Sequence, residues 1–148
     1  MSNFLRGFNF SDFFITRGAN RYVAEAVRNT LGNEEAAFKK QMSEIKRFQH
    51  NFRKKLIAAN PKIAREHSIM ERSDKPPSRE YQAFMREANA RSNTAVRKQF
   101  KNVLPAMNKY QARRQAFERD MQDKYAAANP MYARYLAEQR RREQASKQ

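Results

Sequence analysis

The sequence contains no cysteine and no tryptophan, and it has only three glycines. Without cysteine, these residues form no disulfide bond, no thiolate metal site and no cysteine nucleophile. The alternation of Val, Ile and Thr that is typical of strands is also missing, so we expect no β-sheet. No apolar run approaches the roughly 20 residues that a membrane-spanning helix needs. The chain is therefore not expected to be integral to a membrane.

Residue patterns that support catalysis are scarce as well. The three glycines are scattered and cannot form a glycine-rich phosphate loop. His50 and His67 lack the spacing of a metal-binding motif, and we interpret them as an exposed and a half-buried structural residue. The carboxylates are dispersed among bases at helical spacings, which is typical of surface ion pairs. The sequence thus predicts a protein that is not an enzyme and uses no metal, cofactor or small-molecule substrate.

Negative charge is also scarce relative to positive charge. Lys and Arg together number 31 against 15 Asp and Glu, which gives a formal net charge of +16. Such a charge repels itself unless an anionic partner accepts it. Nucleic acid is the commonest partner of this kind, followed by an anionic lipid surface and an acidic protein.

Helical periodicity is the main pattern in the first half of the chain. A short helix is predicted to begin at Asn20 and to end at Gly32, since Asn is a favoured N-cap and Gly a favoured stop. Asn33 is predicted to cap a second helix, because two glutamates follow it where carboxylates offset the helix dipole. The second helix carries a continuous seam at alternating intervals of four and three residues, consisting of Phe38, Met42, Ile45, Gln49, Phe52, Leu56 and Ala59.

Further helices are predicted in the second half of the chain. A short helix follows Asn60-Pro61 and ends near residue 72, where a Pro-rich linker begins. A long helix starts at Ser78, and Pro105 is expected to kink it or to begin another helix. The last helix is predicted to start at Pro130 and to end in a basic polar tail.

One segment of the sequence occurs twice. Residues 55–65 and 124–134 share the pattern Lys-x-x-Ala-Ala-Asn-Pro-x-x-Ala-Arg at an offset of 69 residues. Because Asn favours the N-cap and Pro the first helical position, each copy predicts a compact corner between two helices. Phe48 and Phe117 extend the match, whereas positions outside this stretch match poorly. Two explanations stay open, a duplicated helix-corner-helix unit and a coincidence of two helix-start signals.

These patterns predict an all-α protein. We expect an elongated array of long amphipathic helices with two Asn-Pro helix corners, an extended N-terminal arm and a basic C-terminal tail. An organelle-targeting segment is the alternative for the arm, because its arginines far outnumber its acidic residues. The predicted division is an aromatic and basic arm (1–19), a first helical unit (20–72), a Pro-rich linker (73–78), a second helical unit (79–139) and a basic polar tail (140–148).

Basic residues are concentrated on particular helix faces. On the second predicted helix, Lys40, Arg47 and Lys54 lie opposite the apolar seam at seven-residue spacing. A solvated helix face usually mixes both signs of charge, so this one-sided face favours contact with phosphates. A plain solvated surface is the alternative. The residues predicted to bind nucleic acid are Lys39, Lys40, Lys46, Arg47, Arg53, Lys54, Lys55, Arg113, Arg114, Arg140, Arg141 and Arg142.

The leading hypothesis is a structural subunit of a large ribonucleoprotein, similar to a ribosomal protein of an organelle. Its partners would be rRNA-like RNA and neighbouring protein subunits, and RNA is preferred over DNA because no module that reads duplex DNA is apparent. One alternative is a peripheral accessory subunit of a mitochondrial membrane complex, such as a respiratory complex or ATP synthase, with a membrane surface as partner. Another is a virion or nucleoid packaging protein. The compartment stays open, with the mitochondrial matrix or inner-membrane surface favoured.

Overall fold

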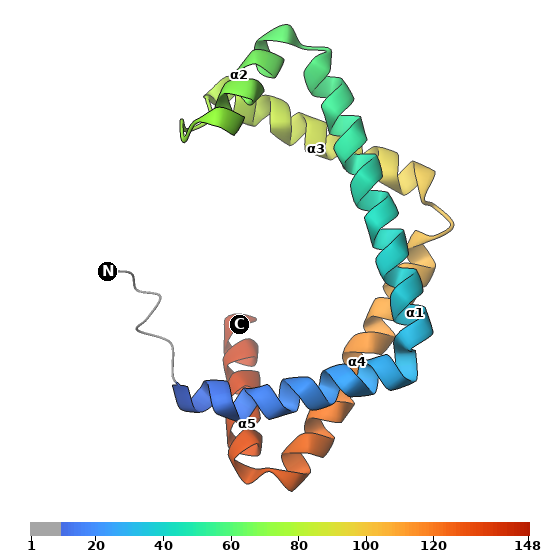
Figure 1. Ribbon diagram of the computed structural model, residues 1–148, viewed down its shortest axis with the longest axis vertical. Coiled ribbons are helices and arrows are strands. Elements are labelled where there is room, and N and C mark those ends of the chain that lie inside the picture. Colours follow the sequence, from blue (N-terminus) through green and yellow to red (C-terminus); the bar gives the residue numbers. More distant parts are fainter. Residues whose placement is uncertain (1–9) are drawn as a thin grey trace. The chain divides into compact units, whose positions relative to one another are not determined.

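The computed structural model describes residues 10–148, and every regular element in this range is a helix (Figure 1). The all-α prediction is confirmed, and no strand occurs among the described residues. The helices are α1 (Phe10–Ala58), α2 (Pro61–Arg72), α3 (Arg79–Gln99), α4 (Leu104–Ala128) and α5 (Pro130–Ser146).

Helix α1 is longer than the sequence predicted. Two helices were expected on either side of Gly32, with Asn20 and Asn33 as N-caps, but all three residues lie inside α1. The only non-helical backbone within α1 is at Leu31, with φ −116° and ψ 15°. Leu31 is buried, so packing retains a kinked helix where local signals predicted two. The predicted arm is helical from Phe10 onward, and its first nine residues lie outside the described residues.

Asparagine precedes proline at the start of both α2 and α5. Asn60 and Asn129 have similar extended backbones, with φ −119° and ψ 98° for Asn60 and φ −137° and ψ 91° for Asn129. The Asn60 side chain accepts a hydrogen bond from the Ile63 backbone N–H at 3.3 Å, which satisfies one free donor of α2. The Asn129 side chain instead donates to the Tyr125 carbonyl at 2.9 Å. Only the first of these two asparagines therefore caps the following helix with its side chain.

The chain forms two compact units that do not follow the predicted division at residues 73–78. The terminal unit consists of residues 1–36 and 109–148, and the central unit consists of residues 37–108. Helices α1 and α4 each contribute to both units. The predicted linker lies within the central unit, where it joins α2 to α3.

The core of the terminal unit lies between the first part of α1, α4 and α5. Ala19, Tyr132 and Leu136 are buried there, and Ile15 packs against them. The rings of Tyr22 and Tyr125 lie 5.6 Å apart. Near the other end of this helix pair, Glu35 contacts residues at the beginning of α4. Hence α1 and α4 run antiparallel in the terminal unit.

The core of the central unit lies between the second part of α1, α3 and the first residues of α4. Ile45 and Val96 are buried together with Met107. Further along the same helix pair, the Gln49 side chain donates to Asn93 at 3.5 Å. The Arg53 side chain donates to Asn89 at 3.1 Å. Helices α1 and α3 therefore run antiparallel in the central unit, in the same way as α1 and α4 in the terminal unit.

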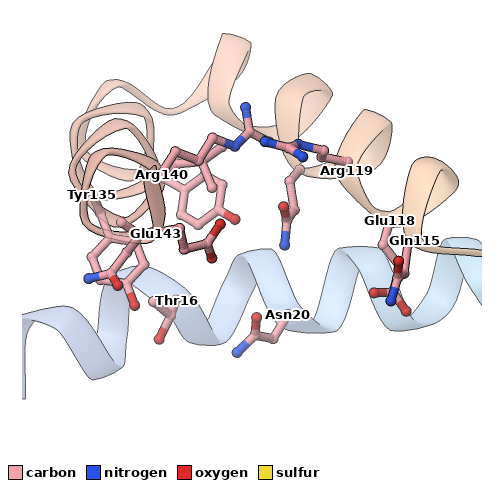
Figure 2. Close-up of a pocket in the computed structure, with 12 residues that line it drawn as sticks. Thr16, Asn20, Gln115, Glu118, Arg119, Tyr135, Arg140 and Glu143 are labelled. Carbon is pink, nitrogen blue, oxygen red and sulfur yellow. The ribbon is translucent and has the colours of Figure 1, made fainter. Parts of the chain in front are cut away.

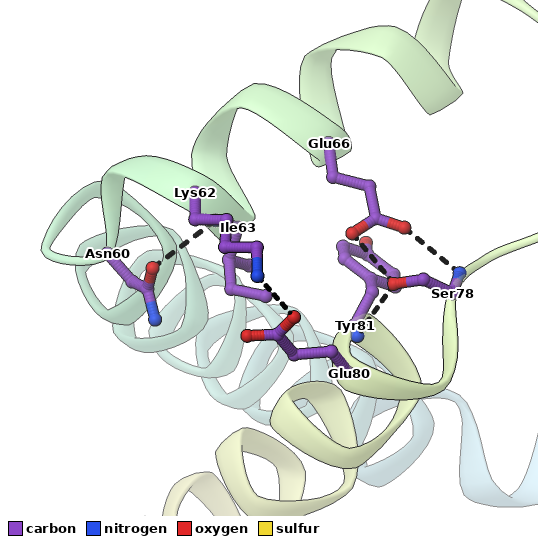
Figure 3. A network of polar contacts seen from close by, with 7 residues as sticks. All are labelled: Asn60, Lys62, Ile63, Glu66, Ser78, Glu80 and Tyr81. Carbon is purple, nitrogen blue, oxygen red and sulfur yellow. Dashed lines mark hydrogen bonds and ion pairs between the residues drawn. The ribbon is translucent and has the colours of Figure 1, made fainter.

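A polar network joins α2 to the start of α3 (Figure 3). Glu66 accepts hydrogen bonds from the Ser78 backbone N–H at 2.9 Å and from the Ser78 hydroxyl at 2.8 Å. The Ser78 hydroxyl also accepts from the Tyr81 N–H at 3.1 Å, so Ser78 is the N-cap of α3. Lys62 Nζ lies 2.7 Å from a Glu80 carboxylate oxygen. These contacts hold α2 against α3 and thereby place the central core.

Candidate nucleic-acid interface

The exposed cations on the second part of α1 form the main candidate site. The buried Ile45 and the half-buried Phe38 and Met42 fix which face of α1 points inward. Opposite that face, the helix presents a row of charges. Six of the predicted residues are exposed and, among the described residues, form no ion pair with a carboxylate: Lys39, Lys40, Lys46, Arg47, Lys54 and Lys55.

Arg53 lies at the edge of this row and differs from its neighbours. Its side chain is half-buried and donates to Asn89 on α3. It also lines a cavity of about 590 Å³ in the central unit, together with His50, His67 and Glu71. Arg53 therefore connects two helices, and its charge is less accessible than that of Lys54.

Two of the predicted arginines in the terminal unit contact glutamates of α1. Arg113 forms a hydrogen-bonded ion pair with Glu34. The Nε atom of Arg114 lies 3.1 Å from a carboxylate oxygen of Glu35 and 3.2 Å from one of Glu118. The hydrogen bond to Glu34 raises the pKa of Arg113. The sequence assigned the two glutamates to a helix N-terminus, but the structure shows that they are partners of α4.

The arginine cluster near the C-terminus is divided in the same way. Arg140 Nη1 lies 2.7 Å from Asp123, and Arg142 Nη2 lies 2.8 Å from Glu138. Arg141 is exposed and has no ion pair within the described part of the chain. Opposite charges within about 4 Å partly compensate one another. Of the predicted residues in the terminal unit, Arg141 is thus the one best placed to meet an external anion.

Tyr110 is a partner of Glu35 that the sequence did not predict. Its hydroxyl donates a hydrogen bond to the Glu35 carboxylate. Burial raises the pKa of Tyr110 to about 12, and the hydrogen bond to Glu35 raises it further toward that value. An aromatic residue at a seam position gave the only signal in the sequence, and this signal predicted packing without indicating the acceptor.

The terminal unit contains a cavity of about 600 Å³ between α1, α4 and α5 (Figure 2). Its lining mixes cations, carboxylates and amides and includes Asn20, Glu118, Arg119, Arg140 and Glu143. In neither cavity do the described residues bring together three His, Asp or Glu side chains that could hold a metal ion. Both cavities are therefore polar spaces between helices without a recognisable set of metal ligands.

The two histidines have the surroundings that the sequence predicted. His50 is exposed, and His67 is half-buried. His67 Nδ1 lies 2.8 Å from the Tyr81 hydroxyl, and its Nε2 lies 3.1 Å from a Glu71 oxygen. His67 thus holds α2 against α3, as a structural residue does.

Comparisons with protein-family models, with curated proteins and with solved structures found no match to the chain. Among the described residues, no helix has the length and apolar character that crossing a membrane requires.

Proposed function

We propose that the chain is a non-enzymatic structural subunit of a large ribonucleoprotein, similar in kind to a ribosomal protein, and that it binds RNA phosphates through basic helix faces. The observation that carries the proposal is the row of exposed, unpaired cations on α1, whose opposite face is held in the central core. The helical corners, the basic tail and the neighbouring protein subunits belong to this proposal as features of a chain that lies along folded RNA.

The rigidity of α1 supports phosphate binding. Lys40, Arg47 and Lys54 repeat every seven residues, which places their charges about 10 Å apart along a helix. A pre-formed row of charges loses little conformational freedom on binding, whereas disordered cations have to be ordered first. Each phosphate contact releases counterions and makes binding weaker as salt is added.

Charge reversal tests this proposal. Changing Lys40, Arg47 and Lys54 together to Glu should weaken binding to a structured RNA and lower the salt dependence of log Kd by about one for each lost contact. The measurement is a binding titration of the full chain over a series of salt concentrations.

A matched control separates this face from net charge. Lys75, Lys101 and Lys147 are exposed cations outside the row, and reversing these three changes the net charge by the same amount. Equal losses in the two variants would show that the α1 row is not the RNA contact.

A peripheral membrane subunit is the second candidate, and one observation favours it. Phe14 and Met131 are 67% and 66% exposed, and they line the same largely apolar groove of about 480 Å³ in the terminal unit. Arg17 and Arg21 follow Phe14 on α1 and are exposed. Apolar side chains beside cations are typical of a surface that binds anionic lipid.

Flotation with anionic and neutral vesicles tests this second candidate. The membrane function predicts that the full chain floats with anionic vesicles and that the double variant Phe14→Ser, Met131→Ser does not. Point substitutions are preferable to deletion of residues 1–19, because Ile15 and Ala19 belong to the terminal core. A chain that floats with neither kind of vesicle would exclude the membrane function.

A further inference from the structure

The offset of 69 residues relates far more of the chain than the two Asn-Pro segments. Helix α3 (Arg79–Gln99) corresponds to residues 10–30 of α1. The kink at Leu31 corresponds to Phe100 at the end of α3, and their backbones are alike, with φ −116° and ψ 15° against φ −106° and ψ 24°. Helix α2 corresponds to the first three turns of α5. We call residues 10–72 repeat A and residues 79–141 repeat B.

The two repeats share residues as well as helix ends. Of the 63 aligned positions, 18 carry the same residue. Each of these 18 residues is buried, half-buried or exposed alike in the two repeats. Ala19 and Ala88 are both buried, as are Val27 and Val96. The sequence analysis found a poor match outside residues 48–65, because the identities are widely spaced and emerge only when the helices are aligned.

Each unit combines helices from both repeats. The terminal unit takes residues 10–36 from repeat A and residues 109–141 from repeat B. The central unit takes residues 37–72 from repeat A and residues 79–108 from repeat B. In both units, therefore, the first helix of one repeat packs on the second and third helices of the other.

The cavities of the two units obey the same correspondence. They have volumes of about 590 Å³ and 600 Å³. Five of the seven residues that line the central cavity have their counterpart, 69 residues away, in the lining of the terminal cavity. The five pairs, with the residue of the central cavity first, are His50 and Arg119, Arg53 and Gln122, His67 and Leu136, Glu71 and Arg140, and Met85 and Thr16.

Among the 18 shared residues, six are cations, and all of them are exposed in both repeats. Lys124 lies 3.9 Å from Asp120, and within the described residues the other cations of this set form no ion pair. Core packing explains the shared alanines and valines, and helix starts explain the shared Asn-Pro, but neither explains an exposed cation. The six pairs are Arg17 and Arg86, Arg28 and Arg97, Lys40 and Lys109, Lys55 and Lys124, Arg65 and Arg134, and Arg72 and Arg141.

The shared cations also follow the helical period. In repeat A, those of the first, second and third helices are 11, 15 and 7 residues apart, which are close to three, four and two turns at about 3.6 residues per turn. The two shared cations of each helix therefore lie on similar sides of it. The cavity linings, in contrast, changed chemically between the repeats, since Glu71 corresponds to Arg140. External positive charge was kept, whereas the chemistry of the cavities was not.

We propose that repeats A and B are two copies of one three-helix unit that exchange their first helices, and that each unit of the chain presents its own copy of a cationic surface for an RNA backbone. Each complete set of six cations contains two residues from one repeat and four from the other. The chain then binds RNA at two equivalent places. The number of sites rests on the proposed function, whereas the exchange of helices does not.

Cross-linking in the full chain tests the exchange. Gln49 and Asn93 contact one another in the central unit, and the offset places Glu118 and Ala24 at the equivalent positions of the terminal unit. Because the chain has no cysteine, paired cysteines at 24 and 118, or at 49 and 93, react selectively with a short bis-maleimide. A protease site inserted between Lys75 and Pro76 then separates the repeats.

With exchanged helices, either cysteine pair should keep the two fragments joined on a denaturing gel after cleavage. If each repeat folded on itself, cysteines at 24 and 49 would react instead and the fragments would separate. Failure of the 24 and 118 pair to link the fragments, while the 49 and 93 pair does so, would overturn the equivalence of the two units.

Stoichiometry tests the two sites. Titration of the full chain with a short RNA oligonucleotide, followed by native mass spectrometry, should show two oligonucleotides bound. Reversing Arg28, Lys109 and Arg134 to Glu should leave one, and so should reversing Arg97, Lys40 and Arg65. The control variant at Lys75, Lys101 and Lys147 should still bind two.

The outcomes separate the two proposals. A single site on the unmodified chain, or loss of both sites in either triple variant, would overturn the duplicated surface. No binding of RNA at all would reject the proposed function and with it the two sites, while the cross-linking result would still decide whether the repeats exchange helices.

Discussion

Arg114 occupies a position on α4 that corresponds to the buried Ile45 on α1. An arginine on an inward-facing side of a helix needs compensation for its charge. Carboxylates of Glu35 and Glu118 lie within 3.2 Å of its Nε atom and provide that compensation. The same helix position thus holds an apolar contact in one unit and an ion pair in the other, so a cation at a seam position was a poor guide to phosphate binding.

Gly32 provides a test of helix stability at a single residue. It lies within α1, and a Cβ atom at this position would have no atom within 4 Å. Alanine loses less conformational entropy than glycine when a helix forms. Gly32→Ala should therefore raise the free energy of unfolding by about 0.5–1 kcal/mol, measured by urea denaturation.

Gly18 is the matched control for this substitution. A Cβ atom at Gly18 would lie 2.4 Å from the Tyr125 hydroxyl oxygen, so the tyrosine has to shift. Gly18→Ala should consequently gain less stability than Gly32→Ala. A larger gain at Gly18 would contradict the close approach of Tyr125 to α1.

Tyr110 gives the terminal unit a pH dependence in the alkaline range. Its pKa is about 12 in the folded chain and about 10 in an unfolded one. As the pH rises above 10, the unfolded state loses the proton first, so stability is lost between about pH 10 and pH 12. Tyr110→Phe should make this loss smaller, as measured by urea denaturation at several pH values.

Absorbance of the tyrosinate ion gives an independent measure of the same group. The difference between the titration curves of the unmodified chain and Tyr110→Phe should have its midpoint near pH 12. Because burial is the largest cause of the raised pKa, Glu35→Gln should lower this midpoint only in part. A midpoint near pH 10 in the unmodified chain would contradict the buried hydroxyl.

At the scale of the element, Ser78 determines where α3 begins. Its hydroxyl accepts from Tyr81 N–H and donates to Glu66. Ser78→Ala should destabilise the chain by about 1 kcal/mol through loss of the cap. It should also raise the pKa of Glu66, which hydrogen bonds from Ser78 hold below its ordinary range.

The two effects can be measured separately. Urea denaturation at neutral pH reports the loss of the cap, and carboxylate NMR titration reports the pKa of Glu66. In the unmodified chain, the stability that Glu66 contributes is present above its ordinary pKa and is lost as the pH falls through the lowered value. Ser73→Ala is the control, since its hydroxyl donates to the Ile69 carbonyl and caps no helix N-terminus. Equal effects of the two substitutions would contradict the capping role.

The sequence predicted elements well where a long apolar period coincided with a start signal. The seam from Phe38 to Ala59 was assigned to a helix, and α2 begins at Pro61 as predicted. The first helix was placed ten residues too late, because Asn20 is a good N-cap in isolation. Burial of Ile15 and Ala19 outweighs that local preference.

At the scale of the whole molecule, the sequence did not predict which helices pack together. The Pro-rich linker at 73–78 indicated a boundary, yet the units are assembled from residues far apart in the chain. Helical periodicity shows which face of a helix is apolar, but many other helices in the chain offer a matching face. The partner of α1 in each unit thus had to come from the structure.

The candidate site was predictable in the same uneven way. Spacing alone identified the outward row from Lys39 to Lys55, because the opposite seam fixes the orientation of one helix. It did not distinguish Arg113 and Arg140 from free cations, since their carboxylate partners lie on other helices. Pairing across helices decides which charges stay available to a ligand.

The exchange of first helices also sets an order for folding during synthesis. Residues 10–36 emerge early, but the helices on which they pack begin at residue 109. Their apolar side chains therefore stay without a native partner while about 70 further residues are translated, and a ribosome adds roughly 5–20 residues per second. The central unit can close first, and the beginning of the protein can reach its final contacts only when the end of the protein has been made.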